Sequence, residues 1–185
     1  MRLTTTSYVV LGMVALRGPS TSYDLKRAVG HSVGYFWPFP HAQLYSEPKR
    51  LVELGLLDVA VENHGRRRQT FTITESGRAR LRRWLGEPTS DQLQVRDVAE
   101  LKLFFGELAT PDDILALAAE QIAQHEDRIA VYEQMESQFG ARADVAARMV
   151  PLRLGLRLEH AALAFWQDLL AERSSTAERP ATAHR

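Results

Sequence analysis

The sequence predicts a mainly α-helical protein that contains one small β-hairpin and is divided into two domains. Apolar residues recur at the helical spacing of three and four through most of the 185 residues. One short stretch alternates apolar and polar residues instead, as a strand does. The segment Pro88-Thr89-Ser90-Asp91 has neither pattern and marks the boundary between the domains.

Three helices are expected first along the chain. The first, residues 3–17, carries apolar side chains at helical spacing and ends at a Gly-Pro pair. The second, residues 22–30, follows hydroxyl residues that can accept hydrogen bonds from its free N–H groups. An irregular aromatic segment, residues 31–40, leads to a third helix over residues 42–57, which contains a glycine suited to its end.

The pattern changes after the third helix. Apolar and polar residues alternate over 57–61 and again over 70–74, with Asn-His-Gly at 63–65 between them, which predicts a two-stranded hairpin. A threonine then caps a fourth helix, residues 75–86. Three helices, a hairpin and a helix make up a winged helix-turn-helix domain, which we assign to residues 1–88.

The second domain is expected to be helical throughout. Helices are predicted over residues 94–108, from Pro111 to about Gln138, and over residues 152–170. Together they form an antiparallel, coiled-coil-like helical dimerisation domain over residues 91–173. The remaining residues, 174–185, have no core-forming pattern, and we expect this tail to be disordered.

Apolar residues on these helices predict self-association. The helix from Pro111 carries a seam of alternating three- and four-residue spacings, which fits either an internal helix pair or an interface between two copies. The last helix, which Pro151 either starts or kinks, is apolar around most of its circumference and must be covered on two sides. This second observation favours a homodimer. The expected interface residues are Leu115, Ile122, Ile129, Leu158, Phe165, Trp166 and Leu169.

Several function classes are excluded by the residues present. There is no cysteine, no Gly-rich phosphate loop and no nucleophile elbow, so we expect neither an enzyme nor a cofactor. His125 and Glu126 begin a zinc-protease motif, but Ile129 stands where the second histidine belongs, so no metal site is expected. No apolar run reaches the roughly 18 residues of a membrane span. The chain therefore predicts a cytoplasmic protein.

Charge is distributed unevenly although its sum is zero. Residues 1–90 hold 13 Lys and Arg against 7 Asp and Glu, whereas residues 91–185 hold 10 against 16. This asymmetry fits either charges scattered over a solvated surface or a first domain that alone binds a polyanion.

The positions of the basic residues favour double-stranded DNA as that polyanion. The second and third helices with their loop suit a major groove of about 12 Å, where Gln43 and Arg50 can pair with adenine and guanine edges. Three successive arginines at the hairpin tip repel one another without a partner, so we expect them either along the phosphate backbone or in the minor groove. The candidate DNA-binding residues are Tyr23, Lys26, Gln43, Tyr45, Lys49, Arg50, Arg66, Arg67 and Arg68.

Three segments resemble the PadR-like transcriptional regulators. AQLYSEPKRLVELGLL at 42–57 resembles the family's third helix, residues 23–26 its second-helix start, and QTFTITESGRARL at 69–81 its wing and following helix. The resemblance extends over about residues 3–172 and implies a dimeric winged-helix regulator, often a repressor, sometimes released by a small effector. Pro48 departs from the pattern: either the third helix kinks there, or it starts late with Ser46 as its cap.

Two functions remain open at this point. The first is a homodimeric repressor that binds a near-palindromic operator, and the second is a winged-helix adaptor that binds protein and no DNA. A small apolar or aromatic effector is also conceivable, because several aromatic residues could line a pocket between subunits, although such residues are more often core. The residues concerned are Tyr35, Phe36, Trp37, Phe39, Phe165 and Trp166.

Overall fold

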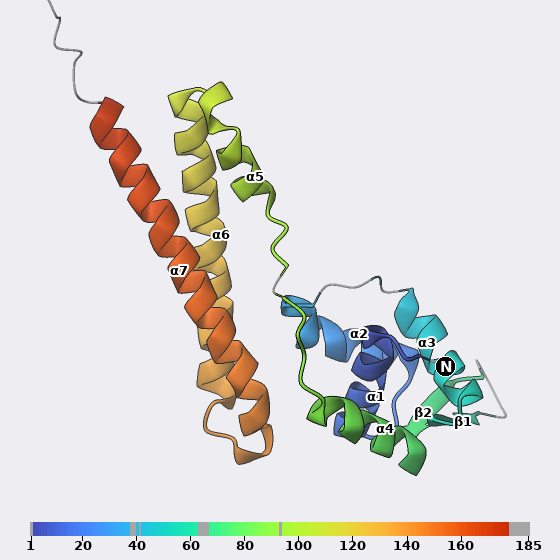
Figure 1. Cartoon of the computed structure of the whole chain (residues 1–185). Coiled ribbons are helices and arrows are strands. Elements are labelled where there is room, and N and C mark those ends of the chain that lie inside the picture. Colours follow the sequence, from blue (N-terminus) through green and yellow to red (C-terminus); the bar gives the residue numbers. More distant parts are fainter. Residues whose placement is uncertain (1, 38–39, 41, 63–66, 93, 178–185) are drawn as a thin grey trace, which may run out of the picture. The chain divides into compact units, whose positions relative to one another are not determined.

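The computed structural model describes residues 2–37, 40, 42–62, 67–92 and 94–177. The chain forms two compact units, Met1–Gln92 and Leu93–Arg185, each of which we describe by itself (Figure 1). Among the described residues, no helix has the length and hydropathy to cross a membrane.

The first unit has the predicted order of three helices, a hairpin and a fourth helix. Threonine side chains accept N–H bonds at the start of α1, α2 and α4, so local capping fixes where these helices begin. A short 3-10 helix, η1, lies in the aromatic segment that was expected to be irregular. The elements are α1 (Thr5–Arg17), α2 (Ser22–Gly30), η1 (Val33–Tyr35), α3 (Gln43–Glu53), β1 (Leu57–Val61), β2 (Gln69–Ile73) and α4 (Glu75–Gly86).

The hairpin is antiparallel, with Leu57 opposite Ile73 and Val61 opposite Gln69. Ser20 extends this sheet, because its N–H donates to the Phe71 carbonyl over 3.0 Å and its carbonyl accepts from the Phe71 N–H over 2.9 Å. The loop between α1 and α2 is thereby fastened to β2. The sequence pattern did not predict this bridge.

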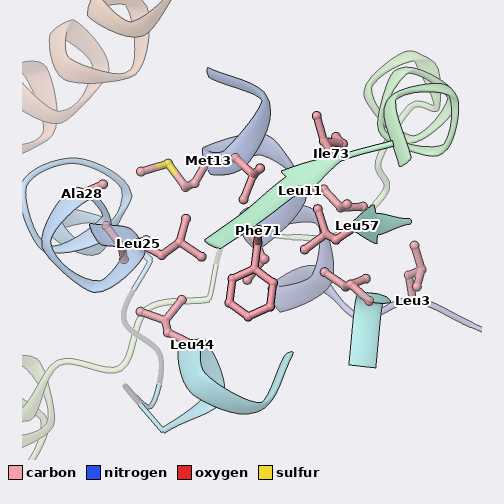
Figure 2. Close-up of a cluster of buried hydrophobic side chains, with 13 residues drawn as sticks. Leu3, Leu11, Met13, Leu25, Ala28, Leu44, Leu57, Phe71 and Ile73 are labelled. Atoms are coloured by element: carbon pink, nitrogen blue, oxygen red, sulfur yellow. The ribbon is translucent and has the colours of Figure 1, made fainter. Parts of the chain in front are cut away.

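One hydrophobic core holds the first unit together. Phe71 of β2 is 1% exposed and lies in a cluster with Leu11 of α1, Leu25 of α2 and Leu44 of α3 (Figure 2). Leu57 of β1 joins the same cluster. The core therefore fixes α3 against the other elements that were predicted to form a DNA-binding domain.

Pro48 lies inside α3 and is fully buried. The helix begins at Gln43, so the late start capped by Ser46 is wrong. Proline has no N–H to donate to the carbonyl of Leu44, which lies one helical turn earlier. The buried ring instead adds to the apolar face of α3 beside Leu44 and Leu51.

The second unit consists of helices, and α6 and α7 pack along each other (Figure 1). Thr110 and Asp113 form a reciprocal capping box at the start of α6, as the residues there predict. The elements are α5 (Val98–Phe104), η2 (Gly106–Leu108), α6 (Pro111–Phe139), η3 (Ala143–Val145) and α7 (Ala146–Ala177).

Three boundaries in this unit differ from the sequence predictions. α5 starts at Val98 because the Asp97 side chain caps it, so residues 94–97 are not helical. Pro151 lies inside α7 and does not mark its start. α7 also continues to Ala177, beyond Ser174, where we expected the disordered tail to begin; residues 178–185 lie outside the described part.

Part of the expected dimer seam is buried within the single chain. Trp166 is 4% exposed and forms a buried cluster with Ala118, and Ile122 and Leu169 pack against this cluster. Ile129 is buried in a second cluster. At these positions the burial supports the internal helix pair, the alternative that the spacing left open. Of the other expected interface residues, Leu115 is half-buried, whereas Leu158 and Phe165 are each 52% exposed.

Candidate nucleic-acid interface

α3 has one buried face and one polar face. Leu44, Pro48 and Leu51 point into the core, whereas Tyr45 and Lys49 are exposed. Gln43 is also exposed, and its Oε1 accepts a hydrogen bond of 2.8 Å from the Thr6 hydroxyl of α1. Its amide N–H groups are the donors that could reach a base edge.

Arg50 lies on the same side of α3 as Gln43, seven residues further along the helix, but its guanidinium is engaged by other side chains. Its Nε and one Nη donate to the two carboxylate oxygens of Glu47 over 3.0 and 2.6 Å, and the same Nη donates to the Ser7 hydroxyl over 2.8 Å. The Ser7 hydroxyl donates in turn to Glu47 over 2.6 Å, and Ser7 is fully buried. We call Ser7, Glu47 and Arg50 the α1–α3 clamp.

The clamp stabilises charge at both of its ionic residues. Burial raises the pKa of Glu47, but hydrogen bonds from Arg50 and Ser7 outweigh burial and leave that pKa below its ordinary value. The hydrogen bond to Glu47 raises the pKa of Arg50. Both groups are therefore charged at neutral pH, and their ion pair anchors α3 to α1.

This placement bears on the role expected for Arg50, which stays a prediction. The sequence predicts a residue that reads guanine, but here its side chain is 26% exposed and committed to Glu47 and Ser7. The exposed face of α3 is left with Gln43, Tyr45 and Lys49 as its candidate contacts.

The wing, which is the hairpin of β1 and β2, approaches the start of α2. Arg68 lies 3.4 Å from Asp24, the residue that pairs with Thr21 in the capping box of α2. Hydrogen bonds from Thr21, reinforced by Arg68, hold the pKa of Asp24 below its ordinary value. Arg67 is exposed and adopts a positive φ of 47°. Arg66 lies outside the described residues.

The exposed face of α2 carries the two remaining candidates. Tyr23 and Lys26 are both exposed, and Tyr23 directly precedes the Asp24 that contacts the wing. The fold therefore brings the α2 start and Arg68 together. Arg50 differs from the other candidates on α3 because the clamp engages its guanidinium and leaves the side chain 26% exposed.

Sequence reasoning missed Ser7, Glu47 and Thr6. The pair of Glu47 and Arg50 is spaced i, i+3 on a helix, a signal that could have indicated their ion pair. Nothing in the sequence connects Ser7 to either residue, since they are 40 and 43 positions apart.

The histidine considered as a metal ligand has another partner. His125 Nδ1 lies 2.6 Å from Glu159 Oε2, so α6 and α7 are joined by this contact. Within the described ranges, no group of three or more metal-ligating His, Asp or Glu side chains occurs.

The comparisons with known proteins agree with this geometry. A model of the transcriptional regulator PadR-like family matches residues 10–83, and a model described as virulence activator alpha C-term matches residues 95–173. A "probable transcriptional regulator", Rv1176c of Mycobacterium tuberculosis, is 31% identical over 170 residues, which cover 83% of this chain and 89% of that protein. The negative transcriptional regulator PadR of Bacillus subtilis is 25% identical over 124 residues, covering 66% and 68% of the two chains.

The solved structures of Bacillus subtilis PadR share the fold of this chain. The complex with operator DNA has a TM-score of 0.83 at 21% identity, and the match covers 92% of this chain and 99% of that one. The complex with p-coumaric acid has a TM-score of 0.77 at 20% identity and the same coverage.

Proposed function

Because the chain belongs to the PadR-like family of transcriptional regulators, we propose that it is a homodimeric repressor of a near-palindromic operator in double-stranded DNA. The observation that carries this proposal is the exposed polar face of α3, fixed by a buried core and accompanied by the arginines of the wing. A regulator of this kind needs no catalytic site, and we expect it in the cytoplasm with the DNA it controls.

Recognition would begin with α3 in the major groove. The amide N–H groups of Gln43 can donate to an adenine edge, and Lys49 and Tyr45 can hold the phosphates beside it. The wing would lie along the backbone, where Arg67 and Arg68 neutralise phosphates and release counterions. Tyr23 and Lys26 would add contacts from α2.

Dimerisation would use apolar residues that the second unit leaves exposed. Leu154, Leu158 and Phe165 are spaced so that they follow one stripe along α7, and each is more than half exposed. On α5, Val98, Leu101 and Phe104 are exposed as well. A second copy that covers these residues would present two recognition helices to half-sites about one helical turn apart.

Relief of repression by a small molecule is part of the proposal. Bacillus subtilis PadR is a negative regulator and was solved with p-coumaric acid as well as with operator DNA. By analogy, an organic acid would lower the affinity of this protein for its operator.

The wing arginines provide the decisive test. The operator is first selected from a random duplex library, and its affinity is then measured by fluorescence anisotropy over a range of salt concentrations. Replacing Arg66, Arg67 and Arg68 with Ala should weaken binding for all sequences and flatten the salt slope by about two to three units. The matched control replaces three exposed arginines of the second unit, Arg148, Arg157 and Arg173. An unchanged slope, or no binding to duplexes even in dilute buffer, would support the adaptor instead.

Gln43 tests the other half of the proposal. Gln43→Ala should relax preference at one base pair, with a cost of about 1–3 kcal/mol on the preferred operator and little on others. A competition assay with operators altered at single positions measures this. An equal loss on every sequence would show that Gln43 does not read a base.

A further inference from the structure

The second unit contains a polar cavity beside α6. Its volume is about 360 Å³, near the lower end of the roughly 300–1,000 Å³ found for sites that enclose small molecules. The residues that line it are Arg96, Asp97, Gln121, Gln124, His125 and Arg128. All of these side chains carry hydrogen-bonding groups, and two of them are permanently charged guanidinium groups.

Arg96 brings a second guanidinium to the cavity, beside that of Arg128. Within the described residues, it makes no hydrogen bond or ion pair, and it is exposed at the cavity. Arg128 has one Nη 3.3 Å from Glu159 and keeps further N–H donors available. Guanidinium groups pair with carboxylates through two parallel hydrogen bonds, so two arginines at one cavity favour an organic acid.

The acidic groups around the cavity are already engaged. Glu159 binds both His125, at 2.6 Å, and Arg128. Asp97 accepts the Ala99 N–H over 2.8 Å as the cap of α5. Neither carboxylate forms a hydrogen bond or ion pair with Arg96 in the described part of the chain, so its guanidinium remains available to a ligand.

The rest of the lining is suited to hydroxyl groups. Gln124 uses its amide nitrogen on Glu120 and retains its carbonyl oxygen, and Gln121 offers both a donor and an acceptor. His125 commits Nδ1 to Glu159 and retains Nε2. A purely apolar acid would remove water from these groups without replacing its hydrogen bonds, which costs affinity.

We propose that this cavity binds a small hydroxylated organic acid, with its carboxylate on Arg96 and Arg128, and that this acid is the effector of the regulator. The role as effector site rests on the repressor function proposed above, whereas the binding itself does not.

Isothermal titration calorimetry on the full chain tests the binding. The probes are gluconate, sorbitol, which has the hydroxyl groups without a carboxylate, and hexanoate, which has a carboxylate without hydroxyl groups. Gluconate should bind saturably in the millimolar range, and the other two at least tenfold more weakly. Arg96→Ala should weaken gluconate binding about tenfold or more, because a charged hydrogen-bond partner is lost. Arg173→Ala, an exposed arginine of α7 outside the cavity, should leave it unchanged.

Several results would overturn the proposal. The first is that gluconate gives no saturable heat. The second is that Arg96→Ala binds gluconate as tightly as the unaltered protein does. The third is that hexanoate or sorbitol binds as tightly as gluconate. Because Arg96 is exposed and forms no hydrogen bond or ion pair with the described residues, its replacement should not affect folding, which circular dichroism checks.

Operator binding separates this inference from the function it rests on. Gluconate should lower operator affinity for the unaltered protein but not for Arg96→Ala, and Arg96→Ala should bind the operator normally without the acid. If gluconate binds and operator affinity does not change, the cavity is not the effector site. If no operator is bound at all, the repressor function fails while the calorimetric result stands.

Discussion

The two units of the chain bury their apolar residues in different ways. In the first unit, thirteen of the described residues form one buried cluster that draws on three helices and both strands. In the second, two clusters contain three buried residues each, while Phe104 is 80% exposed and Leu108 is 87% exposed. The first unit therefore has a core of its own, whereas the second presents apolar surface that a partner could cover.

Geometry explains this difference. In the first unit, a hairpin and helices that cross one another enclose a common volume around Phe71. In the second, α6 and α7 are helices of 29 and 32 residues that pack lengthwise, so each can bury only one stripe against the other. An apolar stripe outside the pair, such as that of Leu158 and Phe165, stays exposed in this unit and is suited to cover by a second chain.

The largest effect should come from placing charge on that stripe. Leu158→Glu together with Phe165→Glu should convert the dimer to a monomer, because two carboxylates would have to be buried without partners. Operator affinity should then fall about 10²–10⁴-fold, since the second half-site loses its linked recognition helix. Analytical ultracentrifugation measures the oligomeric state, and anisotropy measures the affinity.

The control for this change carries the same charges on the polar face of α7. His160→Glu with Gln167→Glu places them on exposed positions away from the stripe and should preserve the dimer. If both double variants remain dimeric, the second unit associates through residues other than Leu158 and Phe165.

The first unit should be most sensitive at its core. Phe71→Ala should lower its free energy of unfolding by about 3–5 kcal/mol, because the removed ring leaves a cavity that several elements surround. Val61→Ala, on the exposed outer part of the same hairpin, should cost less than about 1 kcal/mol. Urea denaturation followed by circular dichroism gives both values. Similar losses in the two variants would contradict a core centred on Phe71.

The features that could be predicted from the sequence are those that depend on near neighbours. Thr21, Thr74 and Thr110 cap helices through residues three positions away, so those helix starts could be derived from spacing. The hairpin followed from alternation. The bridge from Ser20 to Phe71 could not be derived, because it joins backbone groups 51 positions apart that no side-chain pattern marks.

The candidate site was predictable to a similar extent. The amphipathic pattern of α3 was enough to predict that this helix carries candidate contacts. It could not show that Arg50 is engaged while Lys49 is exposed, because that difference depends on Ser7 of α1. The seam on α6 was ambiguous for a related reason. A stripe spaced by three and four is the same whether the helix it meets belongs to its own chain, as at Ile129, or to another copy.

The α1–α3 clamp should contribute an intermediate amount to stability. Glu47→Gln removes one charge from a half-buried ion pair and should lower the free energy of unfolding by about 1–3 kcal/mol. The control is Glu87→Gln, an exposed carboxylate of the same unit that lies outside the clamp, which should have little effect. If the two variants are equally stable, the clamp does not hold α3 in solution.

The smallest effect concerns pH and isolates the same carboxylate. The folded state holds the pKa of Glu47 below its ordinary value, so its contribution is complete above the unfolded pKa, about 4.3. That contribution should decrease as the pH falls below this value and vanish once the pH passes the lower, folded pKa. The free energies of unfolding of the unaltered protein and of Glu47→Gln, measured by urea denaturation, should therefore differ most near neutral pH and become similar in acid. Other carboxylates, such as Asp24, titrate in both proteins and cancel in the difference. A gap that widens on acidification would mean that Glu47 is bound more tightly when protonated, which is incompatible with a clamp built on its charge.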